Sequence, residues 1–256
     1  MVIDSYMNYV YDGTFSGLLT VIHEIYYLHI IPISISANCD LKEVQSNFLY
    51  EYKFINTNNE KATKVKNAIQ SKIGLQSLEK VYLSFLSSID KKELVIYNYI
   101  KLGFKLGTST DKHLYTEEVS SINKLVNKVN REVMNMAGFI RFTYKNSFYY
   151  AAYEPDHNIT ELLAPDFVDR FADQHFVIHD VRRNIAVLYD TKEWILTNFC
   201  EAQLEFLDSL EVNNDIFYET LWKEYFQNTA IKERKNDKQQ KLHMPKRYWK
   251  NMLETK

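Results

Sequence analysis

The sequence predicts an α+β protein, in which an antiparallel sheet built from two hairpins carries packed helices. Residues 138–190 read as a hairpin, a short helix and a second hairpin with almost no connecting chain. Apolar residues recur at helical spacing through most of the N-terminal half. We therefore expect a single domain with a mostly helical N-terminal part (1–135), an antiparallel β core (136–200) and a helical basic tail (201–256).

The N-terminal part is expected to begin with a strand, a helix and a second strand. Residues 8–13 alternate as a short strand does and end at a turn. A helical stripe begins at Phe15 and ends near His29, where Pro32 is expected to stop the helix. Aromatic residues at every second position of 44–56 predict a strand with one buried face. The apolar stripes that follow predict helices at 59–73, 75–88, 90–106 and 115–135, with Gly74 and Gly107 at C-cap positions.

The central stretch is expected to start where Gly138 breaks the preceding helix. Alternating runs flank turn-forming residues twice, which predicts two hairpins. A short helix at 159–171, interrupted by Pro165, lies between them. The predicted strands are 139–144, 148–154, 176–180 and 185–189, with an edge strand at 194–199. The tail is expected to form a helix at 212–229 and a short helix opened by Pro245.

Composition places the chain among globular proteins, with 46% hydrophobic and 25% charged residues. No run of 18 apolar residues occurs, so we expect no membrane segment. The two cysteines, Cys39 and Cys200, form no metal spacing and are expected to be free thiols of a reducing compartment. We therefore expect a cytoplasmic protein.

The net charge of −2 hides a basic C-terminus. Residues 231–256 carry nine Lys or Arg residues against three acids, a net charge of +6, so the remainder carries −8. Basic and aromatic residues interleave there, a composition that suits single-stranded nucleic acid. The alternative is a docked terminal helix in which Tyr248 and Trp249 are buried anchors. The candidate nucleic-acid-binding residues of this tail are Arg234, Lys235, Lys246, Arg247, Tyr248 and Trp249.

Two Asp/His pairs are candidate catalytic groups: Asp156-His157 and His179-Asp180. Each pair closes a predicted strand at a turn. If both turns lie at the same end of the sheet, two imidazoles and two carboxylates converge and could move protons. The spacing matches no metal signature, so we assign no metal. The alternative is that the aspartates form turns and the histidines hydrogen-bond backbone carbonyls.

Arginine residues lie near the same elements. Arg141, Arg182 and Arg183 are candidate nucleic-acid-binding residues, because a guanidinium suits bidentate phosphate contacts. An Arg-Arg turn between strands is either a phosphate clamp or an ordinary exposed hairpin tip. The sequence contains no Gly-rich phosphate loop, no nucleophile elbow and no cysteine cluster for an iron–sulfur centre. These absences argue against a looped nucleotide hydrolase and an autonomous radical enzyme, and we expect no cofactor.

Four segments together resemble one bacterial family. They are YVYDGTFSGLLTVIHEIY at 9–26, the run from GFIRF to DRF at 138–171, FVIHDVRRNIAVLYD at 176–190 and the run from LWKEY to NMLE at 221–254. The family is the uncharacterised "probable DNA metabolism" or putative DNA repair family. Its genes typically lie beside a gene for a radical S-adenosylmethionine (SAM) protein, and some relatives are fused to a uracil-DNA glycosylase-like domain. The resemblance implies a DNA-linked role with a radical SAM partner.

Three functions remain open from the sequence. The first is an accessory protein that binds DNA, with single-stranded DNA the favoured form, and works with the radical SAM partner. The second is a DNA-acting enzyme, a glycosylase or phosphodiesterase, that uses the Asp/His pairs for acid–base chemistry and the arginines for phosphate. The third is a protein-interaction scaffold without DNA contact. Family members often carry a histidine where this chain has Val133-Met134, which weakens the enzyme hypothesis.

Overall fold

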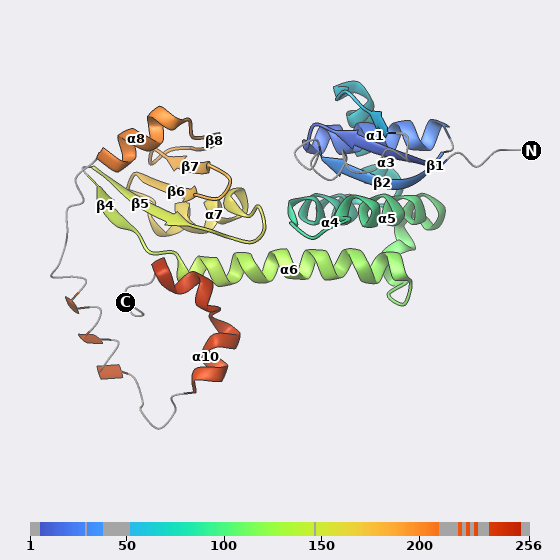
Figure 1. The fold of residues 1–256 in the computed structure, drawn as a ribbon. Coiled ribbons are helices and arrows are strands. Elements are labelled where there is room, and N and C mark those ends of the chain that lie inside the picture. The colour runs from blue at the N-terminus through green and yellow to red at the C-terminus, as the bar shows by residue number, and fades with distance from the viewer. Residues whose placement is uncertain are drawn as a thin grey trace, which may run out of the picture. The chain divides into compact units, whose positions relative to one another are not determined.

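The computed structural model describes residues 6–28, 30–37, 52–145, 147–209, 220–221, 224–225, 228–229 and 236–251. The chain divides into two compact units, residues 1–129 and residues 130–256. The boundary falls inside the long helix α6 (Glu117–Phe139) (Figure 1). Each unit has its own sheet and its own helices, which confirms the α+β class.

The N-terminal unit contains a parallel sheet of three strands in the order β2-β1-β3. The central strand β1 (Tyr6–Tyr11) and the helix α1 (Phe15–Leu28) confirm the first two predicted elements. β3 (Tyr52–Phe54) falls within the strand predicted at 44–56, whose earlier residues up to position 51 lie outside the described residues.

The strand β2 (Ile31–Ala37) was not predicted. Pro32 does not end the helix, which stops at Leu28, but lies in β2 beside Met7 of β1. β2 is an edge strand, and proline is tolerated there because its missing N–H costs the sheet no central hydrogen bond. The run IPISISA alternates apolar and small polar residues as a strand does. The strand was not predicted because Pro32 was interpreted only as the end of the helix.

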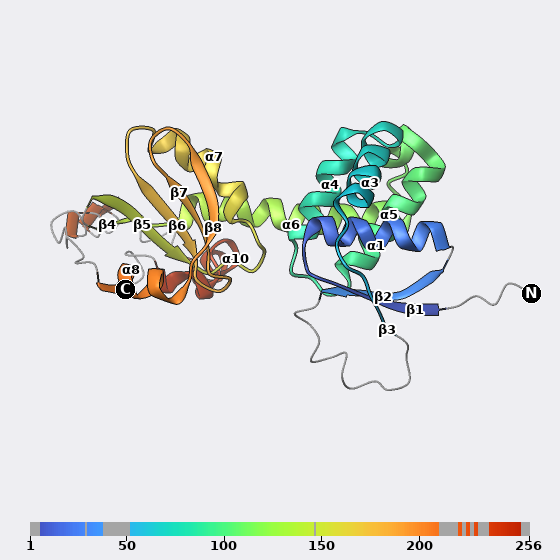
Figure 2. The same cartoon turned by 90° about the horizontal axis from the view of Figure 1, so that it is seen from above.

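The predicted helices of this unit are confirmed as α3 (Asn59–Lys72), α4 (Leu75–Leu86), α5 (Lys92–Leu106) and α6. A 3₁₀ turn, η2 (Gly107–Lys112), follows α5. Gly107 ends α5 at a φ of 63°, a backbone conformation that favours glycine. α1, α3, α4 and α5 lie on one side of the sheet (Figure 2) and enclose a core that includes the fully buried Tyr9 and Ile96.

The C-terminal unit contains a five-stranded sheet in the order β4-β5-β6-β7-β8. Both predicted hairpins and the predicted edge strand β8 form. The first strand, predicted at 139–144, begins only at Thr143, because α6 continues through Phe139. The strands are β4 (Thr143–Lys145), β5 (Phe148–Tyr153), β6 (Phe176–Asp180), β7 (Ile185–Tyr189) and β8 (Trp194–Asn198). The sheet is mixed rather than wholly antiparallel, because β5 and β6 run parallel. The helix α7 (Thr160–Arg170) lies in the crossover between them, and a parallel pair requires such a connection.

Two predicted breaks are wrong. Gly138 does not end α6, since the helix runs on to Phe139 and Ile140 N still donates to Met136 O at 3.0 Å. Met136 and Ile140 are buried, so packing outweighs the cost of a helical glycine. Pro165 does not interrupt α7, which is continuous. Pro165 is exposed, so water can reach the carbonyl that loses its helical N–H donor.

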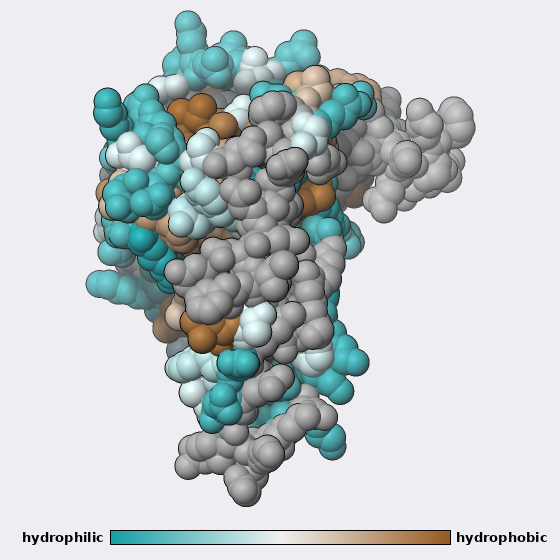
Figure 3. Space-filling view, turned by 90° about the vertical axis from the view of Figure 1, so that its left-hand side faces the viewer, coloured by the Kyte–Doolittle hydropathy of each residue, from teal (hydrophilic) through white to brown (hydrophobic). Residues whose placement is uncertain are grey.

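The described part of the tail is helical. α8 (Glu201–Ser209), α10 (Asp237–His243) and the 3₁₀ helix η4 (Lys246–Asn251) are its elements, and Pro245 precedes η4 as predicted. The helix predicted at 212–229 lies mostly outside the described residues. Cys200 is a free thiol, and Cys39 lies outside the described residues. No described helix is long and apolar enough to cross a membrane. On the face shown in Figure 3, described residues are mostly hydrophilic, with small separate hydrophobic patches.

Candidate functional site

The candidate residues gather at the edge of the large sheet where β5 and β6 end. Because these strands are parallel, with Tyr153 opposite Asp180, the turns that follow them lie at the same edge. Asp156 and His157 lie in the turn after β5, and Arg182 and Arg183 in the turn after β6. The two turns therefore converge, which is the geometry on which the sequence hypothesis depended.

Glu132 of α6 binds the backbone at this edge of the sheet. Glu132 is 6% exposed. Its Oε1 accepts a hydrogen bond from Asp156 N and its Oε2 one from His157 N, each at 2.7 Å. A buried carboxylate is costly unless its oxygens are hydrogen-bonded, and these two N–H groups supply that stabilisation. Glu132 therefore fixes the backbone of the turn after β5.

Arg183 joins the two turns. Its guanidinium lies 2.7 Å from Oδ2 of Asp180, whose side chain is fully buried. It also donates to the carbonyls of Pro155 at 3.2 Å and Asp156 at 2.5 Å. Asp180 Oδ1 in turn accepts the backbone N–H groups of Arg182 and Arg183. The Arg183 side chain is thus a structural bridge between the hairpin tip and the neighbouring turn.

The basic C-terminal segment docks at the same edge. Tyr248 is 7% exposed, and its hydroxyl donates to Glu132 Oε1 at 2.8 Å. Burial, together with the neighbouring Glu132 carboxylate, raises the pKa of the Tyr248 hydroxyl, so it stays protonated and remains a donor. Arg247 forms an ion pair of 2.5 Å with Asp156 Oδ2 and covers the Tyr248 ring. We call these residues, Glu132, Asp156, Asp180, Arg183, Arg247 and Tyr248, the Glu132 corner.

The four candidate acid–base side chains do not form one cluster. His179 and Asp180 are neighbours in β6, so their side chains point to opposite faces of the sheet. His179 Nδ1 lies 2.8 Å from the hydroxyl of Tyr150, and the His179 ring packs on Phe199. Asp180 faces the Glu132 corner, where both its oxygens are engaged. His179 therefore cannot act with Asp180 on one substrate, and the expected convergence of all four groups is wrong.

The described part of the chain offers no metal cluster in place of this arrangement. Among the residues that the structure describes, no group of three or more His, Cys, Asp or Glu side chains could hold a metal ion. His157 is 9% exposed, and its backbone N–H is bound by Glu132. The corner is built to hold backbone and tail in place, with charged groups that are mostly paired.

The remaining candidate cations differ in exposure. Arg141 donates to the carbonyls of Gly138 and Ile140, so it caps the end of α6 rather than facing solvent fully. Arg182 is exposed at the hairpin tip, and its guanidinium has no partner among the described residues. Lys246 is exposed beside the Trp249 ring, with Nζ 6.0 Å from the ring centroid. Arg234 and Lys235 lie outside the described residues.

Tyr248 and Trp249 are held by the protein. Tyr248 is buried in the Glu132 corner, and the Trp249 indole N–H donates to Met244 O at 2.8 Å. The buried-anchor alternative is therefore correct for Tyr248, whose ring is not available to stack on a base. Glu132 is the residue that sequence reasoning did not select as part of the site. Glu132 lies in the apolar stripe of α6, between Val129 and Met136, and a carboxylate on that buried face of the helix would have indicated a structural or functional role.

The fold and the corner together define a class: an α+β protein whose basic C-terminal segment is anchored at one edge of a mixed sheet. Residues 90–254 match the model of a family described as a domain of unknown function, DUF4130. That span is well over half of the chain, so the chain belongs to this family. No curated protein matches the chain.

Proposed function

We propose that this protein is a cytoplasmic accessory protein of DNA metabolism that binds nucleic acid and works with a radical SAM partner. The observation that carries the proposal is the anchoring of the basic tail at the Glu132 corner. Tyr248 and Arg247 hold the segment in place, while Lys238, Lys241 and Lys246 remain exposed on it. Arg182 is exposed at the hairpin tip of the same corner.

Phosphates are the natural partners of such a surface. Neutralising them releases condensed counterions, which makes the affinity for nucleic acid high at low salt and steeply salt-dependent. The anchoring also matters, because an ordered segment loses less conformational entropy when it binds than a free tail does. Since Tyr248 is buried, we expect phosphate contacts to dominate and base stacking to contribute little.

The link to DNA and to a radical SAM partner rests on the family resemblance of the four segments described above. The enzyme alternative is less well supported, because His179 and Asp180 point to opposite faces of β6. The scaffold alternative uses the same exposed surface for a protein partner. Capture of the radical SAM protein before and after nuclease treatment separates association through DNA, which the accessory protein would use, from the direct protein contact of a scaffold. Capture that resists nuclease, from a protein that binds no oligonucleotide, is the scaffold result.

The direct test is fluorescence anisotropy with a labelled single-stranded oligonucleotide. We expect wild-type affinity to fall by at least about tenfold between about 50 mM and about 200 mM salt. The variant Lys241→Glu with Lys246→Glu should bind at least about tenfold more weakly at low salt. The control Lys66→Glu with Lys192→Glu makes the same charge change at exposed positions outside the tail and should bind like the wild type. Equal loss in both variants, or no binding by the wild type, rejects the proposal.

A further inference from the structure

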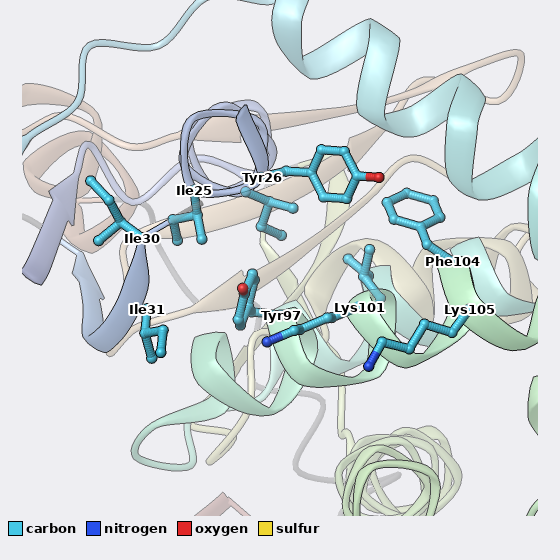
Figure 4. A pocket seen from close by; sticks show the side chains of 10 residues that line it. Ile25, Tyr26, Ile30, Ile31, Tyr97, Lys101, Phe104 and Lys105 are labelled. Atoms are coloured by element: carbon cyan, nitrogen blue, oxygen red, sulfur yellow. The ribbon is translucent and has the colours of Figure 1, made fainter. Parts of the chain in front are cut away.

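The N-terminal unit holds a pocket between α1, the start of β2 and α5 (Figure 4). Its volume is about 300 Å³, at the lower end of the range for small-molecule sites. Ile22, Ile25 and Ile100 line it and are each no more than 2% exposed. Such apolar walls exclude water and favour an apolar group of a ligand.

Aromatic rings form much of the remaining wall. Tyr26 and Phe104 pack edge to face with ring centroids 5.8 Å apart, and Tyr26 is 54% exposed. Tyr97 lies nearer to the N-terminal end of α5 than Phe104 does, on the side of Ile31 (Figure 4). Burial raises the pKa of its hydroxyl, which therefore stays neutral. Rings from two helices around one cavity favour a flat ring as the occupant, because offset and edge contacts add to simple burial.

The charge of the lining has one sign. Lys101 and Lys105 are one helical turn apart on α5, and both side chains extend in the same direction (Figure 4). Among the residues that the structure describes, no acidic side chain lines the pocket. Within the described residues neither ammonium group forms an ion pair, although Lys101 Nζ lies 5.8 Å from the Tyr97 ring centroid. Two cations beside an apolar wall attract an anion whose other end is apolar.

We propose that this pocket binds a small aromatic anion, with its ring against Tyr26, Tyr97 and the isoleucines and its phosphate or carboxylate held by Lys101 and Lys105. A mononucleotide and a free aryl carboxylate both have this chemistry. The site belongs to the N-terminal unit and does not use the basic tail. Its failure would therefore leave the proposed nucleic-acid surface untouched.

The test is a titration with anilinonaphthalene sulfonate, a fluorescent aromatic anion, followed by displacement. Thymidine monophosphate, indole carboxylate and uncharged thymidine are the competitors, and the stronger anion identifies the source. We expect thymidine to compete at least about tenfold more weakly than its monophosphate, because it lacks the charge. Lys101→Gln with Lys105→Gln should weaken binding of the anions roughly tenfold. Lys64→Gln with Lys66→Gln, on exposed positions of α3, is the matched control and should bind like the wild type.

A second pair of variants tests the cavity itself. Ile31 lines the pocket and is 41% exposed. Ile31→Trp should fill the space, so that neither the fluorescent anion nor its competitors bind there. Ile33 is 42% exposed in the same strand but does not line the pocket, so Ile33→Trp should bind normally. Equal binding by the two tryptophan variants overturns the proposal. Undiminished binding by the lysine variant, or thymidine competing as well as its monophosphate, also overturns it.

Discussion

The hydroxyl of Tyr248 donates a 2.8 Å hydrogen bond to Glu132, a residue 116 positions earlier in the chain. The same Glu132 oxygen accepts Asp156 N, so one carboxylate joins the tail, α6 and the turn after β5. The tail is therefore positioned by the same group that shapes the edge of the sheet. This coupling means that loss of the buried contact should affect both stability and the proposed binding surface.

Removing only the Tyr248 hydroxyl tests the anchor. Tyr248→Phe keeps the ring but loses the donor, and we expect the free energy of unfolding to fall by about 1–2 kcal/mol. Trypsin should also cleave more rapidly at Lys241 and Lys246, because the segment is held less firmly. Urea unfolding and timed proteolysis measure the two effects. Tyr115→Phe, at a fully exposed ring, should change neither. An unchanged stability of Tyr248→Phe would show that the contact contributes nothing.

Replacing the carboxylate of Glu132 should cost more than replacing its phenolic partner. Glu132→Gln substitutes an amide N–H₂ for one oxygen and leaves one backbone N–H without its acceptor. We expect a loss of about 2–3 kcal/mol in the free energy of unfolding, measured in urea. Glu205→Gln on α8 makes the same chemical change at an exposed side chain and should stay within about 0.5 kcal/mol of the wild type. Equal effects of the two variants would contradict the role of Glu132.

The adjacent arginines Arg182 and Arg183 offer a matched comparison. Arg183 reaches Asp180 and the carbonyls of Pro155 and Asp156, and a lysine cannot reproduce that planar fork. Arg183→Lys should therefore lower the midpoint of thermal unfolding, with a cost of about 1–3 kcal/mol. Arg182→Lys should leave the midpoint unchanged, because its side chain is exposed. The opposite ranking would mean that the bridge across the turns is not needed.

Local periodicity was sufficient to predict most strands of the C-terminal unit. Alternation at 148–154, 176–180 and 185–189 correctly located three strands, and strand ends correctly located the turns that converge. Each strand's face and ends depend on nearby residues. The parallel pairing of β5 with β6 was missed because it depends on how α7 crosses the sheet, which no short pattern encodes.

The site was predicted less completely for a similar reason. Arg183 and Tyr248 were selected for phosphate and bases, yet their partners are Asp180 and Glu132, the latter from a different helix. A cation's role depends on whether a carboxylate lies beside it in space. His179 was grouped with Asp180 because they are adjacent in sequence, although adjacency in a strand sends their side chains to opposite faces.

Two helical glycines should respond oppositely to alanine. A Cβ at Gly17 of α1 would lie 2.2 Å from Asp12 Oδ1 and 2.9 Å from Thr57 Oγ1, so Gly17→Ala should destabilise despite the better helix propensity. A Cβ at Gly138 of α6 would meet nothing within 4 Å, so Gly138→Ala should stabilise by about 0.5–1 kcal/mol. Urea unfolding of both variants measures the difference. A stabilised Gly17→Ala would show that the turn after β1 moves aside without cost.

The turn after β1 should also make the stability of the protein depend on pH, through Asp12. Burial alone would raise the pKa of the Asp12 carboxyl, but hydrogen bonds from Thr57 Oγ1 at 2.6 Å and from the backbone and hydroxyl of Thr14 outweigh it and lower that pKa. A carboxyl whose pKa is lower in the folded state contributes stability above its unfolded pKa, and this contribution is lost as the pH falls through the folded value. Asp12→Asn should therefore be less stable than the wild type at about pH 7, with a smaller difference at about pH 2, both measured in urea. Thr57→Val removes one of these donors. In a Thr57→Val background, Asp12→Asn should therefore lower the free energy of unfolding at neutral pH by less than it does in the wild type. A difference that does not shrink in acid would assign the effect of Asp12→Asn to shape rather than charge.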